Sequence, residues 1–531
     1  MQHRWRILTG LVALGLALAA CGTASPSAST SASQAAQSQA AQSQAAAEPV
    51  TIIHGTTDQP VSYDPAGSYD LPSWNVIYNV MGNLLTMEPG ATDPTPDLAD
   101  TCQFDDPQTY TCTLRSGVKF QDGSDFTADD VKFSFDRNTA IADPNGASSL
   151  NANLDNVEVV DDMTVTFHLK APDATWPFVL TTGGNAIVPS DAYPADALED
   201  STTMIGTGPY KMTNFQPGVQ TVLEANPDYY GPAPANDKVI IQYFDSSATL
   251  KLALENGEVD LAYRSLTPTE LADLRTTDGV QVVDGQGAEI RYMVFNLNLD
   301  PGSQLAVRQA AAYLIDRQAI ADNVYDGTVE PLWSMDPAGL IGHVDSFKDL
   351  YGDAPDPDAA AQVLSDAGIS TPVDAEIWWT PTHYGDSSAD EYTEIKRQLE
   401  DSGLFNVTLM STEWQEYTGA AFTDQYPVYQ LGWFPDFPDA DNYLGSFYAS
   451  TSFLNIHYGA VDDLIAQERA ETDTAARTQI FQEIQQKVAE DVPIIPIWQG
   501  KQVAAALDGV TGIADTFDPS FIFRYWLISK Q

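Results

Sequence analysis

Strand-type and helix-type patterns alternate along this chain from Thr51 onwards, and this alternation limits the folds open to it. Short apolar runs such as TIIHGTT, RYMVFNLN and VPIIPIWQG are typical of strands. Amphipathic spacing predicts helices over residues 74–85, 305–325, 356–367 and 389–402, and two more within 461–490. Such alternation predicts the α/β class with mixed sheets. The 531 residues are enough for about two to four domains.

The N-terminus has the pattern of an export signal. Arg4 and Arg6 precede an apolar stretch over residues 7–20, which is too short to span a bilayer. Residues 18–21, Leu-Ala-Ala-Cys, resemble the bacterial lipobox, in which the cysteine becomes a lipid-modified N-terminus. We therefore expect a signal peptide over residues 1–20 and a lipid on Cys21. The alternative is an ordinary secretory signal followed by an incidental cysteine.

Residues 21–50 consist largely of Ser, Ala, Gln and Thr and offer little to bury, so they predict a tether with a reach of about 30 Å. After the N-terminal stretch, no segment approaches the ~18 consecutive apolar residues of a membrane helix. The expected location is therefore outside the cytoplasm, with the protein anchored to the outer face of the cell membrane by its N-terminal lipid.

The charge of the chain argues against two classes of partner. Its net charge is −50, from 74 acidic and 24 basic side chains, so it repels nucleic acids and anionic lipid headgroups.

The sequence lacks several common catalytic motifs: no H-E-x-x-H, C-x-x-C, G-x-S-x-G or phosphate-loop pattern occurs. The sequence therefore predicts a monomeric binding protein without catalytic residues, metal or cofactor. An exported hydrolase acting on peptides or glycans is the alternative, and a passive adhesin or scaffold is a third possibility.

Cys102 and Cys112 lie on either side of a turn at Asp105-Asp106-Pro107. The flanking residues are β-prone, so the two thiols fall on opposite arms of a predicted hairpin. Export to an oxidising compartment favours a disulfide between them. We expect this bond to stabilise the hairpin and to have no redox role.

Residues 432–443, GWFPDFPDADNY, combine three aspartates with four aromatic side chains. Three interpretations are open: a metal-binding loop, a catalytic pair of acids, or a pocket that holds a cation. A calcium loop needs oxygen ligands at alternating positions around a central glycine, which this stretch lacks. Two carboxylates three residues apart on a proline-rich loop rarely face each other across a scissile bond. The cation pocket is favoured, because rings and a partly desolvated carboxylate both attract an ammonium group.

Five segments in a fixed order resemble the large extracytoplasmic solute-binding proteins of ABC transporters, in the branch of dipeptide- and oligopeptide-binding proteins known as family 5. They are residues 109–137, 206–218, 223–231, 307–320 and 431–443. The resemblance implies a two-lobed periplasmic-binding-protein fold of the large peptide-binding type, with mixed sheets and an inserted extra domain. It places lobe I at residues 51–91, 206–294 and 507–531, the inserted domain at 92–205, and lobe II at 295–506.

The same resemblance implies a function and a set of contacts. A lipid-anchored receptor of this kind captures a peptide or similar small solute between its lobes and delivers it to ABC permease subunits in the membrane. Asp436 matches the aspartate that pairs with the α-ammonium of a peptide in the relatives, and Trp414 matches a pocket tryptophan. The stretch Gly432, Trp433 and Phe434 is expected to pair with an extended ligand through its backbone.

The resemblance is weaker for the residues that would bind the carboxyl end of a peptide. Relatives often carry an arginine for the ligand carboxylate where this chain has Gln430, or in the segment that holds Thr382, His383 and Tyr384. Tyr263 and Arg264 match a segment that faces the ligand in relatives, so Arg264 is expected to supply the missing cation. Peptides are therefore the leading prediction for the ligand, and amino sugars, oligosaccharides, opines and metal chelates stay open.

Overall fold

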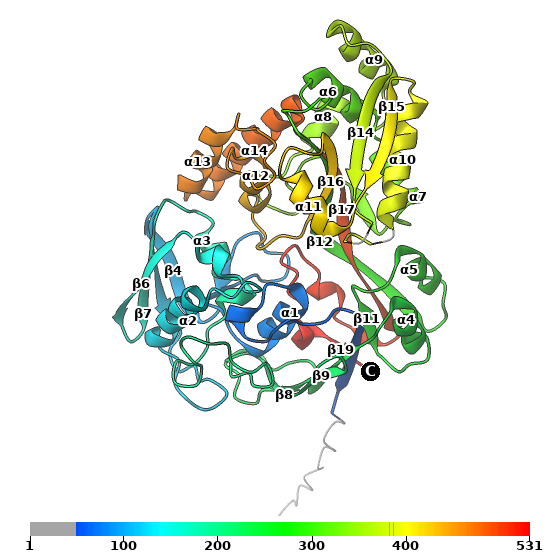
Figure 1. The fold of residues 1–531 in the computed structure, drawn as a ribbon. Helices are drawn as coiled ribbons and strands as arrows, with labels where there is room; N and C mark the ends of the chain where they lie inside the picture. Colours follow the sequence, from blue (N-terminus) through cyan, green and yellow to red (C-terminus); the bar gives the residue numbers. More distant parts are fainter. Residues whose placement is uncertain (1–48, 382, 386) are drawn as a thin grey trace, which may run out of the picture. The chain divides into compact units, whose positions relative to one another are not determined.

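The two longest strands of the protein pair with each other and run through the middle of one large sheet (Figure 1). In this computed structural model, which describes residues 49–381, 383–385 and 387–531, β12 (Val280–Phe295) lies antiparallel to β17 (Ile494–Leu507). The predicted strands RYMVFNLN and VPIIPIWQG form the end of β12 and the beginning of β17. Both strands continue further than expected, because the neighbouring residues also find partners across the pair.

Strands from two separate parts of the chain extend this sheet on either side of the central pair. The order is β15-β14-β16-β12-β17-β11-β1-β10-β9-β8, and β13 pairs with β17 off this path. We call β11, β1, β10, β9 and β8 the first half-sheet, and β16, β14 and β15 the second half-sheet. Parallel pairs such as β1–β10 occur beside antiparallel pairs such as β12–β16, which confirms the predicted α/β class with a mixed sheet.

The bounds of the remaining strands are β1 Thr51–Thr56, β2 Leu85–Thr86, β3 Thr95–Pro96, β4 Ala99–Asp106, β5 Thr109–Leu114, β6 Leu154–Asp161, β7 Thr164–Leu169, β8 Tyr210–Gln216, β9 Gln220–Ala225, β10 Lys238–Tyr243, β11 Leu261–Tyr263, β13 Val329–Pro331, β14 Val373–Trp379, β15 Phe405–Ser411, β16 Val428–Trp433, β18 Val510–Thr511 and β19 Ser529–Lys530. The helices are α1 Leu71–Val80, α2 Ala128–Ile141, α3 Trp176–Val179, α4 Ser247–Glu255, α5 Pro268–Leu274, α6 Leu305–Leu314, α7 Arg317–Asn323, α8 Ser346–Tyr351, α9 Pro357–Asp366, α10 Ser387–Asp401, α11 Trp414–Ala421, α12 Asp441–Tyr448, α13 Asp462–Ala470 and α14 Thr474–Asp491.

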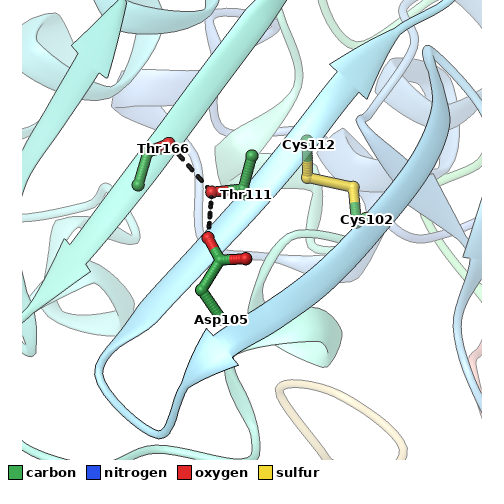
Figure 2. The surroundings of a disulfide bond; sticks show 5 residues. All are labelled: Cys102, Asp105, Thr111, Cys112 and Thr166. Atoms are coloured by element: carbon green, nitrogen blue, oxygen red, sulfur yellow. Dashed lines mark hydrogen bonds between the residues drawn. A yellow bond between two sulfur atoms is a disulfide. The ribbon is translucent and has the colours of Figure 1, made fainter. Parts of the chain in front are cut away.

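The disulfide between Cys102 and Cys112 is formed, as predicted, within a separate antiparallel sheet of order β4-β5-β7-β6. The two cysteines are directly opposite each other on β4 and β5 (Figure 2). Next to them, the Thr111 hydroxyl donates to the Asp105 carboxylate at 2.6 Å and lies 2.9 Å from the Thr166 hydroxyl on β7. Helix α2 packs against this sheet and begins at a capping box formed by Thr127 and Asp130.

Two helix predictions need correction. The predicted single helix over residues 305–325 is two helices, α6 and α7, because Ile315 adopts an extended conformation and the Asp316 side chain caps a new helix by accepting from the Ala319 N–H at 2.9 Å. The predicted helix over residues 74–85 is α1, which starts earlier at Leu71. Asp70 caps its N-terminus, and the chain turns extended at Met81.

Residues 49–531 form one compact unit of contacts. The predicted boundaries of lobe I, the inserted domain and lobe II within it therefore stay predictions. The predicted signal peptide, the lipid site at Cys21 and nearly all of the tether lie outside the described residues. Within the part of the chain that the structure covers, no helix combines the length and the apolar character needed to cross a membrane.

Candidate functional site

A cavity of about 750 Å³ lies where the end of β16 approaches the segment before α1. Its lining includes Tyr69, Trp74 and Arg264 from the first half of the chain. From the second half come Trp414 of α11 and residues 431–436, at the end of β16 and just after it. Of the residues predicted from the sequence, the structure brings together around this cavity Gly432, Trp433, Phe434, Asp436, Trp414 and Arg264.

Asp436 is held at the cavity by neutral hydrogen-bond donors. The Tyr69 hydroxyl donates to Oδ1, and the Asn442 side-chain amide donates to Oδ2 at 2.9 Å. The Asn442 carbonyl oxygen accepts from the Asp436 N–H at 2.9 Å, which fixes the loop. Burial raises the pKa of Asp436 above its ordinary value, and the two side-chain hydrogen bonds offset only part of this shift. Among the described residues, no arginine, lysine or histidine forms an ion pair with this carboxylate.

The other two aspartates of the stretch are structural. Asp439 is fully buried and accepts a two-point hydrogen bond from Arg477, at 2.6 and 2.8 Å. Asp441 accepts from Arg469 at 3.2 Å, and its own N–H donates to Asp439 at 2.9 Å. These anchors hold the loop that carries Asp436, so the three acidic residues have two different roles. Helix α12 begins at Asp441, two residues after Asp439.

Aromatic rings form much of the cavity wall. Trp433 donates its indole N–H at 2.9 Å to the Asn442 side-chain oxygen, which also accepts from the Asp436 N–H. The Trp433 ring stacks on Phe453, with 5.8 Å between ring centroids. Phe434 is 38% exposed and packs edge-on against Phe521 at 5.4 Å. Rings that surround a carboxylate exclude water and present their negative faces to a cation. This combination suits an ammonium group.

Trp414 continues this wall from α11. Its ring stacks face to face on His383 at 3.7 Å, and burial lowers the pKa of that histidine. The neighbouring Tyr384 accepts the Gly432 N–H at 2.9 Å, so this backbone donor is already used within the protein. The predicted backbone pairing with a ligand therefore has to use other groups of the 432–434 stretch. Thr382, the first residue of this predicted segment, lies outside the described residues.

Tyr263 and Arg264 are separated by the fold. Tyr263 is buried, stacks on Phe523 at 4.4 Å and donates its hydroxyl to Gln502 at 2.5 Å, so it does not line the cavity. Arg264 does line it, with its guanidinium 4.9 Å from the centre of the Phe434 ring. An Asp58 carboxylate already accepts from Arg264 at 2.9 Å. Strand β11 ends at Tyr263, and Arg264 follows it in the left-handed backbone region with φ 72°, so the chain changes direction between the two residues.

Three further residues of the site escaped the sequence prediction. Tyr69 and Asn442 hold Asp436, and no local pattern distinguishes Tyr69, which lies 367 positions earlier in the chain. Arg291 lines the cavity from β12. Its signal was visible in the sequence, since it is a charged residue at the start of the apolar run RYMVF. A buried charge in a strand needs a partner, and such residues cluster at functional sites.

The side chains that line the cavity have an excess of negative charge. Asp58, Asp70 and Asp436 line it together with two arginines, Arg264 and Arg291. Each arginine also has an acidic partner, Asp58 and Glu289 respectively. Among the described residues, no group of three or more His, Cys, Asp or Glu side chains is placed to hold a metal ion. The arrangement can bind a cation-bearing organic molecule through one carboxylate and several rings.

Comparison with known proteins gives a consistent result. The family model described as bacterial extracellular solute-binding proteins, family 5 Middle, matches residues 93–455, which is more than half of the chain. The di/tripeptide-binding protein 3 of Pseudomonas aeruginosa (strain UCBPP-PA14) is 28% identical over 472 residues, covering 82% of this chain and 86% of that protein. The heme-binding protein A of Haemophilus influenzae is 27% identical over 485 residues, covering 84% and 86%.

Solved structures show the same fold. HbpA2 from Haemophilus parasuis superposes with a TM-score of 0.81 at 21% identity, covering 91% of this chain and 100% of that one. The periplasmic murein tripeptide binding protein MppA, in its unliganded open form, superposes with a TM-score of 0.80 at 21% identity, covering 91% and 98%. The predicted two-lobed periplasmic-binding-protein fold is thereby confirmed, and the small sheet with the disulfide is its extra element.

The match to the family model includes β8 to β11 of the first half-sheet, the small sheet and the stretch that carries Asp436. It therefore covers many strands of the fold and the loop at the cavity. Proteins of this family bind solutes outside the cytoplasm and are not enzymes, in agreement with the lack of catalytic motifs in the sequence. The chain belongs to the bacterial extracellular solute-binding proteins of family 5.

Proposed function

We propose that this protein is the lipid-anchored substrate-binding component of an ABC importer, and that it captures short peptides and delivers them to membrane permease subunits. The observation that carries this proposal is Asp436, a half-buried carboxylate at a large aromatic cavity that, among the described residues, accepts hydrogen bonds only from neutral donors. A carboxylate in this setting gains most from a ligand that brings a positive charge with N–H donors. The α-ammonium group of a peptide is such a ligand.

The proposed contacts divide the ligand into an ammonium end and a body. Asp436 takes the ammonium, and the rings of Trp433 and Phe434 add cation–π attraction. Trp414 and the backbone of the 432–434 stretch, Gly432 included, contact the body of the peptide. Arg264 lies at the same cavity beside Asp58. A ligand that touches both lobes favours their closed arrangement by its differential affinity for that state.

The relatives support peptides as the class to test first. Their names specify di- and tripeptides for the Pseudomonas aeruginosa protein and dipeptides for an Escherichia coli protein that is 26% identical over 487 residues. Another relative is named for heme, so the family fold alone does not determine the ligand. The proposed lobe boundaries, with lobe I at 51–91, 206–294 and 507–531, place Asp436 in lobe II and Tyr69 in lobe I. The protein is proposed to act as a monomer.

A thermal-shift screen tests the proposed ligand class. Di- to tetrapeptides of alanine and phenylalanine are expected to raise the melting temperature, because a ligand at one hundred times its Kd stabilises the folded state by about 2.7 kcal/mol. Each peptide should be recovered intact afterwards, which separates a binding protein from the alternative of an exported hydrolase. A shift with heme and none with any peptide would contradict the proposal.

The lipid anchor is a separate part of the proposal and is supported by the sequence of residues 18–21. Detergent phase partitioning of the protein expressed in a bacterium with lipoprotein processing tests it. We expect the full chain in the detergent phase and a Cys21→Ser variant in the aqueous phase, because one residue carries the acyl chains. Recovery of the unmodified chain in the aqueous phase would rule out the anchor and leave the binding proposal intact.

A further inference from the structure

Arg291 lies in the wall of the cavity, opposite Gly432 on the neighbouring strand. The residue is only 6% exposed. Its guanidinium occupies the space that a side chain at position 432 would need, because a Cβ atom added to Gly432 would lie 2.6 Å from Cζ of Arg291. The glycine therefore lets this arginine lie across β16 and reach the cavity. Gly432 lies in β16 and not in a turn, so this close contact with Arg291 is the reason for a glycine at this position.

Two rings hold the guanidinium in one orientation. Its Cζ atom is 4.1 Å from the centre of the Tyr384 ring and 4.9 Å from that of Trp498. Nη1 lies 2.7 Å from the Glu289 carboxylate and donates to the Ile290 carbonyl at 3.2 Å. Among the described residues, Nε and Nη2 have no hydrogen-bond acceptor. A buried guanidinium with unused donors is costly unless an acceptor from outside the chain completes it.

We propose that Arg291 binds the carboxylate of the ligand, so that the cavity selects short peptides with both a free amino and a free carboxyl end. This inference rests on the proposed peptide-binding function and adds the second charged end of the ligand to it. The guanidinium presents its donors in a rigid fork that matches the two oxygens of a carboxylate. Arg264 also pairs with one carboxylate, that of Asp58, but its side chain is 25% exposed, so water can satisfy its remaining donors, whereas the side chain of Arg291 is only 7% exposed. Glu289 balances the charge of Arg291 on the Nη1 side and leaves the other donors open.

Calorimetric titration of peptides as free acids and as C-terminal amides tests this inference. The probe is the tightest binder among the di- to tetrapeptides of alanine and phenylalanine, measured in both forms. On the unmodified protein, amidation is expected to lower affinity about 10- to 150-fold, the range for a hydrogen bond to a charged group. The Arg291→Gln variant should bind acid and amide alike, near the affinity of the unmodified protein for the amide. Because the first comparison uses the unmodified protein, it does not depend on whether a variant folds.

Two further variants sharpen the test. Gly432→Ala should reduce the preference for the acid as Arg291→Gln does, because the added methyl group displaces the guanidinium. Arg264→Gln should keep the preference for the acid, whatever its overall affinity. Equal binding of acid and amide by the unmodified protein would overturn the role of Arg291 and leave the proposed function standing. If no peptide binds in either form, the proposed function fails and this inference fails with it.

Discussion

Replacing Arg477 by methionine is expected to lower the free energy of unfolding by about 3–5 kcal/mol, the cost of removing one partner from a buried ion pair. The Arg477 side chain is 5% exposed, and it donates both to Asp439 at 2.6 and 2.8 Å and to Glu468 at 2.9 and 3.1 Å. Without the arginine, Asp439 and Glu468, which are at most 1% exposed, lose their main counter-charge, and only Arg469 remains near Glu468 at 3.7 Å. Burial already raises the pKa of both.

The same change should weaken ligand binding, because Asp439 anchors the loop that carries Asp436. Chemical denaturation followed by circular dichroism measures the stability. Arg397→Gln is the matched control, since Arg397 pairs with Glu394 and Asp401 on the surface of α10 and its side chain is 56% exposed. Little change is expected there, because exposed ion pairs are screened by solvent. Equal stability of the Arg477→Met and Arg397→Gln variants would contradict the structural role of the buried cluster.

The Asp436→Asn variant is expected to lose about 1.5–3 kcal/mol of binding free energy for a ligand with a free ammonium group, roughly a 10- to 150-fold loss of affinity. Asparagine keeps the size of the side chain and can still hydrogen-bond Asn442 and Tyr69, but it lacks the charge. The ligand-free variant should be at least as stable as the unmodified protein at neutral pH. Burial raises the folded-state pKa of Asp436 above its unfolded value, so ionising this group opposes folding as pH rises through the folded-state pKa.

The pH dependence of binding follows from the same shift. The ammonium ligand needs the ionised carboxylate, so affinity should fall as pH decreases through the raised pKa of Asp436. This loss begins at a higher pH than for an ordinary aspartate. Titrations of the unmodified protein and of Asp436→Asn across the acidic range measure it, and the variant should lack this component. An affinity of the unmodified protein that is unchanged throughout the acidic range would contradict a role for the Asp436 charge.

Local patterns in the sequence were sufficient to predict the fold class and many of its elements. The capping box at Thr127 and Asp130 and the disulfide of Cys102 and Cys112 both depend on residues close in sequence. The split of the predicted helix at Ile315 was missed because the amphipathic spacing continues through it, and only the cap formed by Asp316 reveals the break. The extent of β12 and β17 depends on pairing across more than two hundred residues, which no local pattern contains.

The candidate site was predictable where one short stretch carries it. Asp436 and the rings beside it follow from GWFPDFPDADNY and its resemblance to relatives. Tyr69 was not predictable, because its contact with Asp436 exists only after distant segments fold together. The expected cation was assigned to Arg264, whereas the more deeply buried arginine with unused donors at the cavity is Arg291. The sequence showed that Arg291 is a charged residue in an apolar strand, but it did not show which face of that strand lines the cavity.

The central claim is that Asp436 binds the amino end of a peptide. Calorimetric titration of one peptide in its free and N-acetylated forms, against the unmodified protein and Asp436→Asn, tests it most directly. Acetylation removes the positive charge, so we expect the unmodified protein to lose about tenfold or more in affinity and the variant to bind both forms alike. Equal affinity of the unmodified protein for the free and the acetylated peptide would contradict the claim.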